Sequence, residues 1–134
     1  ARRANARRSE APVVNVTLDQ AAAYCAFANT RLPTDKEWLA AAQADCLPFP
    51  WGKDPFGGNA NCIASERGYT LHPPGTSPGD VVRGVYDLLG NAEEWTADGT
   101  VRGSRFCGQP LGTRGDVHAQ GYDSCLGIRC MRAP

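Results

Sequence analysis

The chain of 134 residues lacks several features that would each point to a class of protein. No apolar run approaches the roughly 18–20 residues of a membrane-spanning helix. There is no Cys-x-x-Cys pair, and His72 and His118 stand far apart, so the ligand spacing of a zinc site is absent. No signal peptide is visible, which predicts a mature chain or a piece of a longer precursor. We therefore expect neither a membrane span nor a zinc centre in this chain.

Net charge is absent as well, because 14 basic and 14 acidic residues cancel. The charges are unevenly spread, since Arg2, Arg3, Arg7 and Arg8 crowd the N-terminus and leave the remainder mildly acidic. A basic arm can bind nucleic acid, but it is more often a solvated linker, and an acidic body argues against a phosphate-binding face. We expect no nucleic-acid partner. The length predicts one domain, at residues 12–134, preceded by a flexible Arg-rich arm or linker at residues 1–11.

Cysteine, in contrast, is abundant. An even number of cysteines in a small, loop-rich chain favours three disulfides in an oxidising compartment over a metal site. The expected location is therefore extracellular or periplasmic. A Cys46–Cys62 bond would pin the irregular, Pro- and Gly-rich segment 45–84, and such a loop is worth roughly 3 kcal/mol in the chain-entropy model. The six cysteines are Cys25, Cys46, Cys62, Cys107, Cys125 and Cys130.

Two capping boxes predict two short helices. Thr17 with Gln20 opens the first, which we expect to run to about residue 28, and Thr34 with Glu37 opens the second, which we expect to run to about residue 44. Helical spacing predicts that Ala21, Tyr24, Cys25 and Ala28 share one face of the first helix, and that Trp38, Ala41 and Ala42 share one face of the second. Short strands are predicted at residues 13–16, 85–87, 101–106 and 126–131.

Several motifs, in order, carry a family resemblance over residues 12–132. They are Arg31-Leu32-Pro33-Thr34 with Glu37-Trp38, Pro50-Trp51-Gly52, Asn59-Ala60-Asn61, Gly90-Asn91-Ala92 with Glu94-Trp95, and Leu126-Gly127-Ile128-Arg129-Cys130. In this pattern the chain resembles the formylglycine-generating-enzyme (sulfatase-modifying factor) family. The resemblance implies an α+β, C-type-lectin-like fold with two short helices, a small twisted antiparallel sheet, much irregular loop and stapling disulfides. It also implies a disulfide between Cys25 and Cys130.

The resemblance raises the question whether this chain has the catalytic cysteines of the family. In the formylglycine-generating enzymes, two cysteines spaced five apart follow a Gly-Ser pair, bind copper(I) and activate oxygen to oxidise a substrate cysteine. Soft thiolates suit copper(I). Ser104 and Cys107 match the serine and the first cysteine, but Gly112 stands at the second position. Cys125 could supply another thiol, or it could form a disulfide with Cys107.

Arg129 lies in an apolar stretch, so we expect its guanidinium to pair with a buried carboxylate or with carbonyl groups. The resemblance also implies a possible calcium ion at Asn91 and Glu94, since hard oxygen donors suit calcium. No other cofactor is expected, and copper(I) belongs to the enzyme alternative.

The favoured interpretation is a non-catalytic, disulfide-stapled domain that binds a protein or a small ligand outside the cytoplasm. The resemblance implies that such domains are often attached to bacterial Ser/Thr kinases. Binding is predicted at loop 108–124, because loops on a rigid scaffold usually carry recognition. Two alternatives are a copper-dependent oxidase acting on a substrate cysteine and a retroelement-diversified, variable receptor-binding protein. The predicted ligand-binding residues are Arg105, Gln109, Arg114, Asp116, His118, Gln120, Tyr122 and Asp123.

Overall fold

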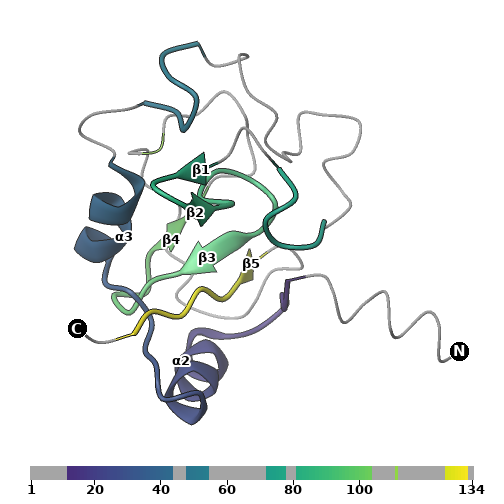
Figure 1. Ribbon diagram of the computed structural model, residues 1–134. Coiled ribbons are helices and arrows are strands. Elements are labelled where there is room, and N and C mark those ends of the chain that lie inside the picture. The colour runs from purple at the N-terminus through teal and green to yellow at the C-terminus, as the bar shows by residue number, and fades with distance from the viewer. Residues whose placement is uncertain are drawn as a thin grey trace, which may run out of the picture.

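The computed structural model describes residues 12–43, 48–54, 72–77, 81–103, 111 and 126–132. These residues form two helices and two small β-sheets (Figure 1). The α+β class predicted from the sequence is therefore confirmed. The predicted arm at residues 1–11 lies outside the described residues. Within the described ranges, no helix has the length and apolar character needed to cross a membrane.

Both helices begin where the capping boxes predicted. Helix α2 (Leu18–Phe27) follows Thr17, whose hydroxyl accepts a hydrogen bond from the Gln20 backbone N–H at 3.2 Å. Helix α3 (Asp35–Ala42) follows Thr34, which caps the helix reciprocally with Glu37. Helix α3 ends at Ala42 because Gln43 adopts a left-handed conformation, with φ of 52°, that cannot continue the helix.

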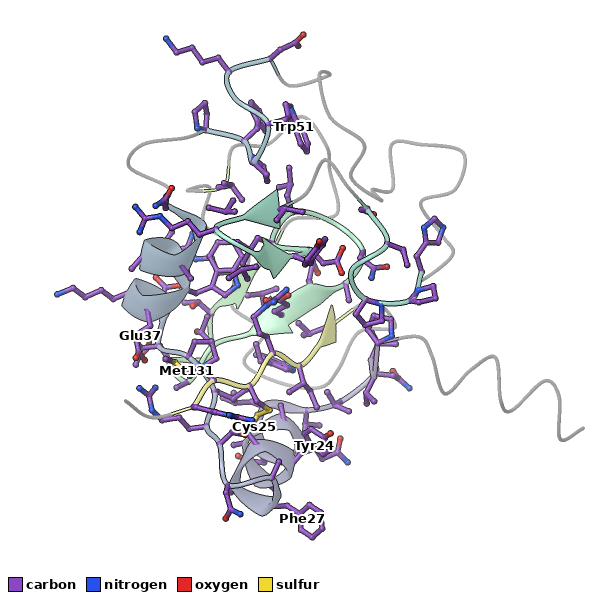
Figure 2. The ribbon with its side chains drawn as sticks, in the orientation of Figure 1. Tyr24, Cys25, Phe27, Glu37, Trp51 and Met131 are labelled. Atoms are coloured by element: carbon purple, nitrogen blue, oxygen red, sulfur yellow. A yellow bond between two sulfur atoms is a disulfide. The ribbon has the colours of Figure 1, made fainter. Side chains whose placement is uncertain are left out.

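The apolar face predicted for α2 is only partly right. Ala21 and Cys25, four residues apart, are fully buried. Tyr24 is 54% exposed and Ala28 is exposed, because the neighbouring stripe of the helix turns toward solvent. Figure 2 shows Phe27 at the far tip of the helix, pointing away from the body of the domain. Helix α2 thus contacts the core through a narrow stripe.

The larger sheet has the strand order β4-β3-β5, with β3 (Glu93–Trp95) in the middle. Strand β4 (Val101–Arg102) pairs with β3 antiparallel, whereas β5 (Leu126–Gly127) pairs with it parallel. The predicted wholly antiparallel sheet is therefore wrong at β5. A tight hairpin forces antiparallel pairing, but the long connection from β4 to β5 allows either direction. Strands β1 (Val81–Val82) and β2 (Val85–Tyr86) form a separate antiparallel hairpin.

The strands are shorter than predicted, and left-handed residues end several of them. The predicted strand at 13–16 is reduced to one bridge from Val14 to Gly127, since Asn15 has a φ of 64°. Asp87, with a φ of 59°, lies beyond the end of β2. Gly103, with a φ of 85°, lies beyond the end of β4, and residues 104–106 are outside the described ranges.

The core has two apolar clusters, each built around a tryptophan that is 1% exposed. Trp38 packs with residues of α3, of β1 and of the segment after β2, and Trp95 packs with residues of α2, β4 and β5. The predicted disulfide between Cys25 and Cys130 is present and joins α2 to the C-terminal segment. In α3, Ala42 is buried beside Trp38, but Ala41 is exposed, so the predicted three-residue face is again narrower than expected.

Candidate functional site

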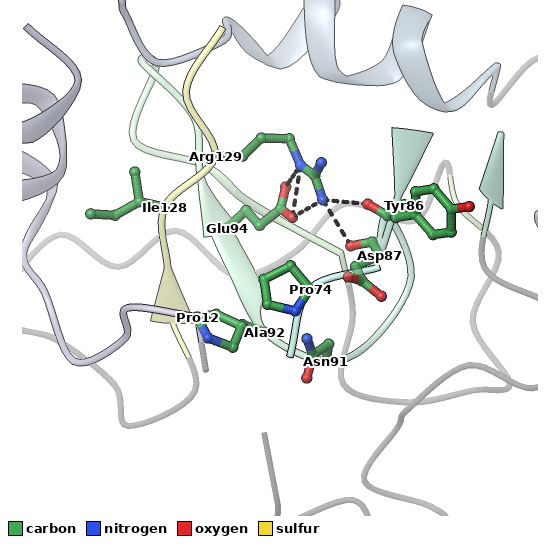
Figure 3. A pocket seen from close by; sticks show the side chains of 9 residues that line it. All are labelled: Pro12, Pro74, Tyr86, Asp87, Asn91, Ala92, Glu94, Ile128 and Arg129. Atoms are coloured by element: carbon green, nitrogen blue, oxygen red, sulfur yellow. Dashed lines mark hydrogen bonds and ion pairs between the residues drawn. The ribbon is translucent and has the colours of Figure 1, made fainter. Parts of the chain in front are cut away.

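Most of the site residues predicted from the sequence lie outside the described residues, so their roles stay predictions. Asn91 and Glu94 are described, and they line one cavity of about 190 Å³. Its walls come from segments far apart in the chain, around residues 12, 74, 86–94 and 128–129 (Figure 3). The predicted residues outside the described ranges are Cys46, Cys62, Ser104, Arg105, Cys107, Gln109, Arg114, Asp116, His118, Gln120, Tyr122, Asp123 and Cys125.

A buried ion pair forms one side of this cavity. Glu94, on the central strand β3, has a side chain that is 7% exposed, and its Oε1 lies 2.7 Å from Nη2 of Arg129. Arg129 Nε donates to both carboxylate oxygens, at 2.9 and 2.8 Å, and Trp38 Nε1 donates to Oε2 at 2.8 Å. The prediction that Arg129 pairs with a buried carboxylate or with carbonyl groups is therefore confirmed for the carboxylate.

Arg129 also connects the ion pair to the end of strand β2. Its Nη2 donates to the carbonyl oxygens of Tyr86, at 2.7 Å, and Asp87, at 3.1 Å (Figure 3). The side chain thus joins three segments of the chain with charge-assisted hydrogen bonds, which are stronger than neutral ones. Because Glu94 neutralises it, the guanidinium adds little net positive charge to the cavity.

Two side chains hold segment 72–77 against the cavity. The Asn91 amide pairs with the backbone of His72: its Oδ1 accepts from the His72 N–H at 2.9 Å, and its Nδ2 donates to the His72 carbonyl at 3.0 Å. The Asp87 carboxylate accepts from the Gly75 N–H through Oδ2 at 2.8 Å. These contacts place Pro74 in the wall of the cavity.

Asp87 is the feature of this cavity that the sequence analysis missed. The residue is 8% exposed, and its Oδ1 has no hydrogen-bond donor among the residues that the structure describes. A sequence signal was present, since an aspartate placed between Val85-Tyr86 and Leu88-Leu89 interrupts an apolar stretch. A buried carboxylate with an unused oxygen is uncommon and calls for an explanation.

The calcium ion predicted at Asn91 and Glu94 would meet oxygens that already have partners. Both Glu94 oxygens accept from Arg129, and Asn91 Oδ1 accepts from His72. Calcium takes 6–8 oxygen ligands. Among the described residues, no three His, Cys, Asp or Glu side chains are grouped to hold a metal. A calcium ion here would need Glu94 to release Arg129, and the calcium site stays a prediction.

A second ion pair lies at the surface beside α3. Arg31 donates to Glu37 through both terminal nitrogens, at 2.6 and 2.7 Å. Together with the Thr34 backbone N–H, this contact lowers the pKa of the Glu37 carboxyl from 4.5 to about 2. Glu37 therefore stays ionised at every pH at which a folded domain of this kind is normally studied.

Comparison with known proteins supplies the context for these sites. Residues 1–134 match the Sulfatase-modifying factor enzyme 1-like domain. The chain is 38% identical over 100 residues to the inactive C-alpha-formylglycine-generating enzyme 2 of Mus musculus, which covers 66% of this chain and 32% of that protein. It is 36% identical over 104 residues to the formylglycine-generating enzyme of Thermomonospora curvata, which covers 68% of this chain and 34% of that protein.

A third relative is of another kind. The serine/threonine-protein kinase Pkn1 of Chlamydia trachomatis is 33% identical over 89 residues, covering 65% of this chain and 14% of the kinase. The chain thus spans about a third of the length of the first two relatives and a smaller share of the kinase. Sequences similar to this chain therefore occur in proteins named as a formylglycine-generating enzyme, as an inactive formylglycine-generating enzyme and as a kinase.

Proposed function

The chain belongs to the sulfatase-modifying factor enzyme 1-like family, and we propose that it is a non-catalytic binding domain of that family. The single observation that carries the proposal is Gly112, which stands where the resemblance places the second copper-binding cysteine. Glycine has no side chain to ligate a metal. One thiolate from Cys107 cannot supply the two soft ligands that the family's copper(I) chemistry requires.

The relatives are compatible with this proposal. The name of the murine relative states that it is inactive, and the chlamydial relative is a kinase. A family domain can therefore persist without the oxidase reaction, or as one part of a signalling protein. A fold supports many functions, so the residues of the site rather than the family decide between them.

The binding surface and the cellular compartment that we propose are those predicted from the sequence. We place binding of a protein or small ligand on loop 108–124, carried by a C-type-lectin-like scaffold. The Cys25–Cys130 disulfide supports an oxidising compartment, because cytosolic thiols are normally kept reduced. The domain would then lie outside the cytoplasm, as a sensor or recognition part of a larger protein such as a Ser/Thr kinase.

Counting free thiols tests the proposal. The chain is alkylated under native conditions and its intact mass is measured before and after reduction. Three disulfides predict no alkylation and a gain of six hydrogens on reduction, with Cys107 bonded to Cys125 and Cys46 bonded to Cys62. This result would leave no cysteine for copper.

The alternative function is a copper-dependent oxidase, and the 36% identity to a formylglycine-generating enzyme supports it. It predicts that the Cys107 and Cys125 thiols are alkylated in the metal-free chain and are protected from alkylation once copper(I) binds. It also predicts that the chain consumes oxygen when a cysteine peptide is added. Substituting Ala for Cys125 would then abolish copper binding. Finding these three results together would overturn the non-catalytic proposal.

A further inference from the structure

We propose that the cavity beside Arg129 binds an organic ammonium group, with Asp87 as its counter-ion and Tyr86 at its mouth. This inference deepens the proposed binding function by naming a ligand class, and it concerns a cavity distinct from loop 108–124. It starts from the carboxylate of Asp87, which is 8% exposed and lines the cavity (Figure 3).

The two carboxylates of the cavity are in different electrostatic situations. Glu94 is compensated by Arg129 and receives a third donor from Trp38. Asp87 receives one backbone N–H, from Gly75, through Oδ2, and no described residue donates to its Oδ1. A buried charge is costly unless it is paired. Because Glu94 and Arg129 cancel, the described charged groups that line the cavity leave one negative charge uncompensated among themselves, on Asp87.

A cation from outside would complete this arrangement, and an ammonium fits it better than a metal ion. An ammonium carries three donors on a compact charge and needs one anionic acceptor at close range. Calcium needs 6–8 oxygens, but the oxygens of Glu94 and Asn91 already accept from Arg129, Trp38 and His72. Among the described carboxylate and amide oxygens that line the cavity, Asp87 Oδ1 is therefore the acceptor that is ready for a new donor.

The other walls suit the carbon part of such a ligand. Pro12, Pro74, Ala92 and Ile128 give the cavity apolar surface. Tyr86 is 43% exposed, so its ring can contact a cation that enters, a contact worth about 0.5–1 kcal/mol at exposed sites, or about 2- to 5-fold in affinity. The volume of about 190 Å³ is below the roughly 300–1,000 Å³ of drug-sized sites. We therefore expect a small alkylammonium, a lysine side chain or an N-terminal amino group.

Titration with n-butylammonium chloride, followed by amide NMR of the full chain at constant ionic strength, tests the inference. The expected result is saturable shifts of the Gly75, Tyr86, Asp87 and Asn91 amides in the millimolar range, with no such shifts from 1-butanol. Asp87→Asn should weaken binding at least about 10-fold. Asn tolerates the left-handed backbone that Asp87 adopts, so this variant is expected to fold. Tyr86→Leu should weaken binding about 2- to 5-fold.

The matched control is Asp19→Asn, which removes the same charge from an exposed position on α2 and should leave the affinity unchanged within about 2-fold. Equal binding of n-butylammonium by Asp87→Asn and the natural chain would overturn the inference. So would equal shifts with 1-butanol, which would show a merely apolar cavity. Shifts of these amides by calcium chloride but not by n-butylammonium would assign the cavity to a metal instead.

The experiment gives an answer even if the variant fails to fold, and its outcome is independent of the thiol measurements. If Asp87→Asn does not fold, the comparison of n-butylammonium with 1-butanol on the natural chain still decides, because the two differ mainly in charge. Thiol counting and oxygen consumption do not involve Asp87. Failure of the ammonium site and failure of the non-catalytic proposal would therefore be seen in separate measurements.

Discussion

At the scale of single residues, Arg129 supports more of the buried polar structure than its place near the C-terminus suggests. Its removal in Arg129→Met would leave the Glu94 carboxylate, 7% exposed, without its cation. Breaking a buried ion pair from one side typically costs about 3–5 kcal/mol. Since the Arg129 side chain is itself 28% exposed, we expect the lower end of this range, about 3 kcal/mol, in the free energy of unfolding measured with urea.

The double variant Arg129→Met with Glu94→Gln is the control for this prediction. Glutamine can still accept a hydrogen bond from Trp38 Nε1, but it buries no charge. The double variant should therefore be more stable than Arg129→Met alone. If it is equally unstable or worse, lost packing rather than the unpaired charge of Glu94 explains the effect.

Glu37 predicts a pH dependence of stability. Its pKa is about 2 in the folded chain, against an ordinary value of 4.5, chiefly because Arg31 donates to it. A carboxyl with a lowered folded pKa stabilises the fold above pH 4.5, and this contribution is lost as the pH falls toward 2. We expect Glu37→Gln to have the lower Tm at pH 6 and the two Tm curves to converge between pH 4.5 and 2. A constant Tm difference across this range would contradict the assignment.

At the scale of elements, Gly127 in β5 controls how the N-terminal segment joins the sheet. A Cβ there would lie 2.7 Å from the Val13 carbonyl oxygen and 3.3 Å from a Val14 methyl carbon. Gly127→Ala must therefore push this segment outward and weaken the bond from the Asn15 N–H to the Leu126 carbonyl, now 3.0 Å. Overpacking of this kind typically costs about 1–3 kcal/mol.

Hydrogen exchange of the Asn15 amide, together with urea unfolding, measures this effect. Gly84→Ala is the comparison, because a Cβ at Gly84 would meet nothing within 4 Å, although its φ of 79° strains that substitution locally. Faster exchange at Asn15 is expected in Gly127→Ala and not in Gly84→Ala. Unchanged Asn15 protection in both variants would show that Gly127 does not fix the segment.

The elements also show what the sequence could and could not predict. Both helix starts were predicted, because Thr17 with Gln20 and Thr34 with Glu37 are local signals that need no partner far away. The strand pairings were not, since the direction of β5 against β3 is decided by residues distant in sequence. Left-handed Asn15 further shortened a strand that its apolar neighbours had favoured.

At the scale of the whole molecule, contacts between residues distant in sequence also form the candidate site, so the sequence could predict only part of it. The apolar stretch around Arg129 predicted that its guanidinium would pair with a buried carboxylate or with carbonyl groups, but it did not identify Glu94 as the partner. Among the described residues, the fold brings the Gly75 N–H to Oδ2 of Asp87 and no donor to Oδ1. Whether a carboxylate oxygen meets a donor depends on which segments the fold brings together, so this feature could be found from the structure and not from the sequence.

The Cys25–Cys130 disulfide is the bond that acts on the whole molecule, because it joins residues 105 positions apart. Closing so long a loop is worth roughly 4–5 kcal/mol in the chain-entropy model, a large part of the 5–15 kcal/mol that stabilises a typical domain. Disulfides nested inside the loop would reduce this only slightly, since the entropy depends on the logarithm of loop length. We therefore expect the paired substitution Cys25→Ala with Cys130→Ala to lower the free energy of unfolding by about 4 kcal/mol.

The urea m-value of this double variant should rise, because the unfolded chain exposes more surface once the disulfide no longer constrains it. A loss below about 1 kcal/mol with an unchanged m-value would mean that other constraints already keep the unfolded chain compact.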